Sequence, residues 1–156
     1  MALLPFQFPS LDHLDDSVRR AHARLELVER LSPRTRAWVR ESFVAFRKRL
    51  VVDSGRAATL LGGDLRRQVH VLEEWVGAMH EQGLARSTVS NYWRGVRLLF
   101  ARVADDHGML NPLEYVRAPH PGVTPPRFLT PQAAETVMRF VRNDTSARPA
   151  LRTRNA

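Results

Sequence analysis

Three arginines, Arg36, Arg40 and Arg47, recur at a spacing that places them on one side of an α-helix. At 100° per residue they lie within about 40° of one another around the helix axis. Guanidinium groups bind phosphate oxygens through paired N–H donors. The row is therefore suited to following a phosphate backbone, and a solvated arginine face without a ligand is the alternative that the sequence leaves open.

A second group of polar side chains gathers at one end of a helix predicted from about Thr88 to His107. These side chains lie off the apolar stripe of that helix, mostly in its N-terminal half: Arg86, Ser87, Ser90, Asn91, Arg94 and Arg97. A helix with arginines and short polar side chains at one end can enter a DNA major groove end first.

Other kinds of chemistry find little support in the residues. The absence of cysteine excludes disulfides, thiolate chemistry and cysteine-based zinc sites. The six histidines show no i, i+4 pair, Gly62-Gly63 lacks the strand and the lysine of a phosphate loop, and Asp105-Asp106 ends a helix. We therefore expect no catalytic residues, no metal, no cofactor and no small-molecule ligand in this chain.

The composition fits a helical domain that binds a polyanion. The 156 residues are 44% apolar and carry a net charge of +8, with 24 basic and 16 acidic side chains. Residues 32–60 hold seven basic and two acidic side chains, and residues 61–85 hold two and four. No apolar run approaches 18 residues, and the start MALLPFQFP is expected to be an extended tail, so a cytosolic protein without membrane contact is predicted.

Four helices must position these side chains. The first spans Ser10 to Arg30, with Ser10 as N-cap and a stripe of Leu11, Leu14, Val18, Ala21, Leu25 and Val28. That stripe either folds back onto the bundle or docks on a neighbouring copy. The second opens at Ser32-Pro33 and buries Val39, Phe43, Phe46 and Leu50; Trp38 points away from this stripe, under the first helix or into a contact surface.

The next segment, from Val52 to Gly63, is predicted to be a loop with at most one turn. A third helix runs from about Asp64 to Gln82, with Leu65, Val69, Leu72, Val76 and Met79 inward and an acidic outer face. The helix that ends at Gly108 begins at a Ser87 or Thr88 cap and buries Val89, Tyr92, Val96, Leu99, Phe100 and Val103. The fold class is all-α, a small four- to five-helix bundle.

A proline-rich connector follows the bundle, and a last helix opens at Thr130-Pro131. We divide the chain into a tail and amphipathic helix (1–31), a helical domain (32–116), a linker (117–129) and the truncated start of a second domain (130–156).

Three sequence pieces, in this order, resemble the N-terminal core-binding domain of tyrosine recombinases, the phage-integrase family. They are LSPRTRAWVRESFVAFRKRL, then EEWVGAMHEQGLARSTVSNYWRGVRLLFARVADDHGMLNPL, then PRFLTPQAAETVMRFV, which resembles the first helix of the catalytic domain. The resemblance covers about Leu31 to Val141. It implies a SAM-like bundle that places two helices in adjacent major grooves of a recombination site.

Carried over by position, the resemblance names the residues expected to contact double-stranded DNA. They are Arg34, Thr35, Arg36, Trp38 and Arg40 on the first groove helix, Arg86, Ser87, Thr88, Asn91 and Arg94 on the second, and Arg127 in the linker. The family's catalytic arginines, histidines and tyrosine find no counterpart here, so the chain itself is expected not to cleave DNA.

Two other functions remain open from the sequence. One is a helical interaction module that self-associates through the stripe from Leu11 to Val28. The other is a helix-turn-helix regulator, disfavoured because no two helices are joined by a turn of three or four residues with a basic second helix.

Overall fold

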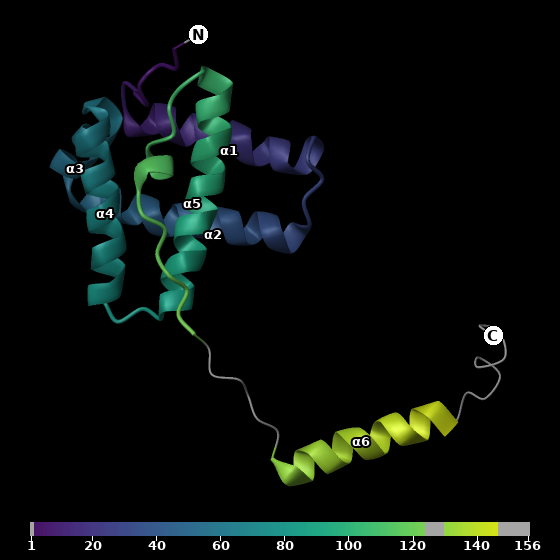
Figure 1. The fold of residues 1–156 in the computed structure, drawn as a ribbon. Helices are drawn as coiled ribbons and strands as arrows, with labels where there is room; N and C mark the ends of the chain where they lie inside the picture. Colours follow the sequence, from purple (N-terminus) through teal and green to yellow (C-terminus); the bar gives the residue numbers. More distant parts are fainter. Residues whose placement is uncertain (1, 124–129, 147–156) are drawn as a thin grey trace. The chain divides into compact units, whose positions relative to one another are not determined.

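The structure, a computed structural model, describes residues 2–123 and 130–146. Over these residues the chain is helical without a β-strand, which confirms the all-α class (Figure 1). The elements in order are α1 (Leu11–Leu27), α2 (Pro33–Val52), α3 (Ser54–Gly62), α4 (Leu65–Glu81), α5 (Arg86–His107), the 3-10 turn η1 (Pro112–Tyr115) and α6 (Pro131–Ser146).

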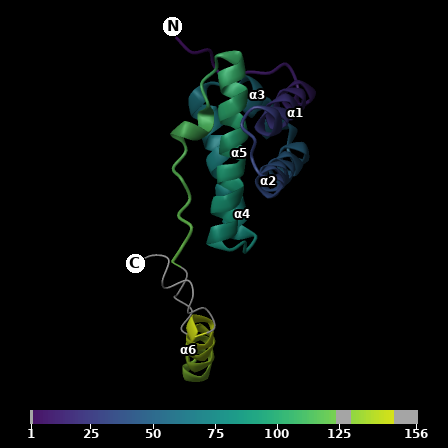
Figure 2. The same ribbon diagram turned by 90° about the vertical axis from the view of Figure 1, so that its right-hand side faces the viewer.

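The chain forms two compact units, Met1–Gly122 and Val123–Ala156. The first unit is organised around α5. Figures 1 and 2 show α1 and α2 crossing α5 on one side, while the segment that contains η1 runs along its other side. Helix α6 belongs to the second unit.

Several helix ends follow the predicted signals. The Ser10 and Ser32 hydroxyls accept hydrogen bonds from the backbone N–H groups of His13 and Thr35, and Asp64 caps α4 in the same way. Gly108 ends α5 in the left-handed conformation, with φ at 62°. The start of α5 was predicted wrongly: Ala85 is its N-cap, no side chain caps it, and Ser87 and Thr88 lie inside the first turn.

The stripe of α1 is part of the chain's own core. Leu14, Val18, Ala21 and Leu25 are buried within the first unit, so the structure has the first of the two predicted arrangements. At the C-terminal end of this helix, Leu27 and Val28 are exposed. The stripe of α2 is confirmed in full, since Val39, Phe43, Phe46 and Leu50 are all buried.

The segment after α2 is a helix and not the predicted loop. The carboxylate of Asp53 accepts from the N–H groups of Gly55 and Arg56 at 3.0 and 3.2 Å, which starts α3 despite the two glycines within this helix. The helix is then held by burial of Ala57, Leu60 and Leu61. Local capping and tertiary packing together outweigh the unfavourable helix propensity of glycine.

The buried face of α4 is rotated from the predicted one. Its buried residues are Gln68, Val71, Leu72, Trp75 and Met79, whereas Leu65, Val69 and Val76 are only partly buried. Two contacts explain the rotation. The Gln68 amide donates to the carbonyls of Phe6 and Leu60, and the Trp75 ring meets Phe46 edge-on at 4.8 Å.

The N-terminal segment packs into the core, contrary to the predicted tail. Leu4 exchanges backbone hydrogen bonds with the end of α5, donating to the carbonyl of Gly108 at 2.9 Å and accepting from Leu110 at 2.7 Å. Phe6 is 1% exposed and stacks on Phe100 with ring centroids 4.9 Å apart. Residues 2–9 are therefore extended but structural.

In the second unit, α6 begins as predicted. The Thr130 hydroxyl accepts from the N–H of Ala133 at 3.2 Å. The apolar residues Val137, Met138, Phe140 and Val141 of α6 are exposed. Among the described residues, no helix combines the length and the apolar character needed to cross a bilayer.

Candidate nucleic-acid interface

The two helices that carry the predicted contacts cross where Ser42 of α2 meets Gly95 of α5. A Cβ built at Gly95 would lie 2.5 Å from the Cβ of Ser42, a distance that no real pair of side chains tolerates. The Ser42 hydroxyl donates to the Trp38 carbonyl at 2.8 Å and is therefore satisfied within its own helix. Glycine at this position lets the two backbones approach, and the crossing fixes the relative positions of both polar groups.

On α2, the predicted residues differ in how available they are. Arg34 is exposed and has no ion-pair partner among the described residues. The Thr35 hydroxyl bonds to the Ser32 hydroxyl at 2.9 Å and belongs to the helix cap. Trp38 is half-buried, with an edge 3.7 Å from a Cβ built at Gly95. It therefore lies close to α5 near the crossing of the two helices.

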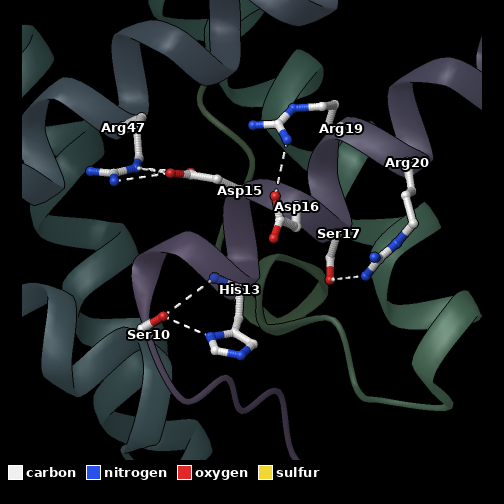
Figure 3. A network of polar contacts seen from close by, with 8 residues as sticks. All are labelled: Ser10, His13, Asp15, Asp16, Ser17, Arg19, Arg20 and Arg47. Atoms are coloured by element: carbon white, nitrogen blue, oxygen red, sulfur yellow. Dashed lines mark hydrogen bonds and ion pairs between the residues drawn. The ribbon is translucent and has the colours of Figure 1, made fainter.

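The predicted arginine row on α2 is divided between two roles. Arg47 donates from Nε and Nη2 to the carboxylate of Asp15 on α1, at 2.9 and 3.0 Å (Figure 3). Arg36 pairs with Glu26, also on α1, at 2.7 Å. These two guanidinium groups connect α1 to α2, so of the three arginines in the row only Arg40 makes no ion pair among the described residues. The hydrogen bonds with Asp15 raise the pKa of Arg47.

Arg40, the middle member of the row, is the one that stays available. It is exposed and makes no ion pair with any described residue. It also lines a groove of about 1000 Å³ that runs along α2 and reaches Gln82, Leu84 and Tyr92 near the start of α5. The groove is rich in cations, and its charged lining consists of Arg36, Arg40, Lys48, Arg49 and Arg56, with Glu41 and Asp53.

Three of these groove cations were not predicted from the spacing of residues along the helices. Lys48 and Arg49 follow Arg47 directly, and Arg56 lies in the segment predicted to be a loop. The charge balance of residues 32–60 was the signal that pointed to them. Arg56 also pairs with Glu74 at 3.3 Å, whereas Lys48 has no such partner within the described part of the chain.

On α5, the predicted residues lie within the first two and a half turns. Arg86, Ser87, Asn91 and Arg94 are exposed, and Thr88 is half-buried. Their side chains form no hydrogen bond or ion pair with other described residues. The absence of a capping side chain also leaves the first N–H groups of α5 open to an anion. Arg97, one turn further, is engaged instead: it donates to Glu114 at 2.7 Å and lies over the Trp93 ring.

Exposed arginines and short polar groups therefore lie at the N-terminal ends of two crossing helices. The predicted linker contact, Arg127, lies outside the described residues. The end of the first unit does reach this region, because a Cβ at Gly122 would lie 3.4 Å from the Cβ of Arg86. The opposite sign of charge gathers elsewhere, on α4, where Glu73 and Glu81 are exposed.

Two of the histidines make hydrogen bonds between helices. His22 bonds to the carbonyl of Arg36 at 2.9 Å, and His107 bonds to the Ser17 hydroxyl at 3.1 Å. In the described ranges, no cluster of three histidine or carboxylate side chains has the geometry to hold a metal ion. Of the two tyrosines, Tyr92 lines the groove and Tyr115 lies in η1.

Comparison of the chain with protein-family models, with curated proteins and with solved structures finds no match.

Proposed function

We propose that this chain binds double-stranded DNA through the exposed N-terminal halves of α2 and α5. The observation that carries the proposal is a set of arginines that make no ion pair with any described residue and lie on two helices that cross closely at Gly95: Arg34, Arg40, Arg86 and Arg94. Arginines without carboxylate partners remain free to neutralise phosphates, and the resulting release of counterions drives binding.

Each polar group has its own part in the proposed complex. Arg34, Arg40 and Arg86 neutralise phosphates and set the position of the protein on the duplex. Asn91 and Arg94 contact base edges in the major groove, where an amide suits adenine and a guanidinium suits guanine. Ser87 and Thr88, at the uncapped start of α5, bind a phosphate together with the backbone N–H groups.

The resemblance to tyrosine recombinases gives this binding a biological setting. We propose that the first unit is the SAM-like core-binding domain of a recombinase or integrase that acts on a mobile element in the cytosol or nucleoid. In this proposal α6 begins the catalytic domain of the parent enzyme, which cleaves and rejoins DNA. The chain described here recognises the recombination site without cleaving it.

Fluorescence anisotropy with labelled duplexes tests the proposal. The full chain should bind a duplex of random sequence with an affinity that falls linearly on a log–log plot as salt increases. Repeated selection from a random pool should then enrich one sequence. The proposal fails if the chain binds no duplex at low salt, or binds single strands and a polyanion such as heparin just as well at every salt concentration.

A further inference from the structure

The C-terminal half of α2 exposes large apolar side chains, which its N-terminal half does not. The N-terminal half exposes Arg34 and Arg40, whereas the C-terminal half exposes Lys48 together with Val44 and Val51, which are 43% and 62% exposed. These valines are seven residues apart and therefore lie on the same side of the helix, two turns from each other. Valine side chains make no polar contact with a phosphate backbone, so this mixed surface suits a partner that has apolar side chains as well as charge.

A groove of about 550 Å³ lies beside these valines, between α1 and α2. Its apolar lining consists of Val18, Phe43, Val44, Val51 and Leu99. Phe43, Val18 and Leu99 are buried core residues, so the groove opens directly onto the core of the first unit. It can accommodate large apolar side chains at its base while its edges remain in water.

The edges of the groove carry an excess of positive charge. Its lining includes one carboxylate, Asp15, which Arg47 neutralises through two hydrogen bonds (Figure 3). Arg40 and Lys48 also line the groove, and neither has an ion-pair partner among the described residues. An apolar base between unpaired cations is complementary to an apolar stripe flanked by carboxylates.

The shape of the groove favours a helix as the occupant. Residues of α2 from Arg40 to Val51 line it, which corresponds to about 17 Å along the helix axis, or three turns. A second helix lying along it would present apolar side chains at i, i+3 or i+4, and i+7. The exposed apolar face of α6 is accompanied by Arg139 and Arg142, so its charge does not suit a groove lined by unpaired cations.

We propose that this groove binds an acidic amphipathic helix of a partner protein. The apolar side chains of the partner contact Val44, Val51 and the base of the groove, and its carboxylates pair with Arg40 and Lys48. Because Arg40 also belongs to the proposed DNA interface, the bound helix covers part of that interface and lowers the affinity for a duplex. The binding of the helix itself does not depend on the proposed DNA function.

A designed peptide serves as the probe for this groove. It is a helical peptide of about four turns with leucines at i, i+4 and i+7 and glutamates on both flanks. Two matched peptides separate the contributions: one has serines in place of the leucines, and the other has lysines in place of the glutamates. We expect the full chain to bind the first peptide at least about tenfold more tightly than either control.

Variants of the chain locate the binding site. Val44→Asp and Lys48→Glu should each weaken binding of the leucine–glutamate peptide by about fivefold or more. Leu27→Asp, at an apolar residue exposed on the end of α1 outside the groove, should leave it unchanged. All three positions are exposed, and circular dichroism checks that each variant is folded. Equal binding to all variants, binding of the serine peptide as tightly as the leucine peptide, or no binding at all overturns the proposal.

Competition with a labelled duplex is measured separately. If the peptide binds in the groove but does not displace DNA, the docking site stands and its overlap with the DNA interface is wrong. If the chain binds no DNA, the peptide titrations still decide whether the docking site exists.

Discussion

Gly95 of α5 lies against Ser42 of α2 so closely that a methyl group at Gly95 would overlap the Ser42 side chain. Since α2 and α5 carry the proposed DNA contacts, this one approach sets the distance and angle between the two recognition groups. The packing at this crossing therefore determines the geometry of the proposed DNA interface.

Replacing Gly95 with alanine should separate the two helices. We expect the free energy of unfolding to fall by about 1–3 kcal/mol because of overpacking, despite the better helix propensity of alanine. Gly77→Ala is the matched control, since a Cβ at Gly77 has nothing within 4 Å. It should raise stability by about 0.5–1 kcal/mol in the same urea titrations. Equal effects at both glycines would show that the crossing is not tight.

The packing of the N-terminal segment gives a second prediction. Phe6 is almost fully buried against Phe8 and Phe100. Phe6→Ala should therefore lower the free energy of unfolding by about 3–5 kcal/mol. Leu3→Ala, at an exposed position in the same segment, should change it by less than about 0.5 kcal/mol. A small effect at Phe6 would mean that the segment does not belong to the core in solution.

Phe6 and Gln68 show which parts of the fold the sequence could and could not predict. Helix spans and caps follow from local spacing, so α1, α2 and the end of α5 were predicted well. Phe6 and Gln68 were missed because their burial depends on residues about sixty positions away, as the hydrogen bond from the Gln68 amide to the Phe6 carbonyl illustrates. A periodicity argument sees only one element at a time.

The sequence likewise predicted one part of the candidate site and missed another. The exposure of Arg34, Arg40, Asn91 and Arg94 was expected from their positions off the apolar stripes. The pairing of Arg36 and Arg47 with α1 was not, because a helical projection of α2 does not include the acidic residues of another helix. Asp15 and Glu26 were visible in the sequence, but only the packing of α1 on α2 brings them to those arginines.

The pair between Glu29 and Arg102 predicts a specific dependence on pH. Hydrogen bonds from Arg102 hold the pKa of Glu29 below its ordinary value of 4.5. A carboxyl group with a lowered pKa in the folded state stabilises the fold above its ordinary pKa, and this contribution is lost as the pH falls through the folded-state value. The pair is partly exposed, so its contribution is about 0.5–1 kcal/mol.

Glu29→Gln should therefore be less stable than the parent at neutral pH by about this amount, with the difference disappearing in acid well below pH 4.5. Denaturant titrations at several pH values measure it. Glu81→Gln, at an exposed position of α4 without an ion pair among the described residues, is the control variant in the same titrations. A difference at Glu29 that persists in strong acid would rule out the ion pair as its cause.

We expect the side chains of α5 to determine which DNA sequence the chain prefers. With a duplex obtained by selection, Asn91→Ala and Arg94→Ala should each lose about 1–3 kcal/mol of discrimination against the wrong base at one position. Arg97→Ala is the control, because Arg97 is engaged by Glu114 and Trp93. It should keep the preference of the parent. If Arg97→Ala relaxes the preference and the other two do not, the recognition face of α5 has been placed on the wrong side.

The most direct measurement of the central claim compares Arg40 with Arg47 in the same salt titration. The account predicts that Arg40→Ala weakens binding to every duplex and reduces the slope of log K against log salt by about one, with stability unchanged. Arg47→Ala should instead lower the free energy of unfolding by about 1 kcal/mol and leave the slope unaltered, because its charge is already paired with Asp15. A slope that is the same for the parent and for Arg40→Ala, or a parent chain that shows no salt-dependent binding to DNA, would contradict it.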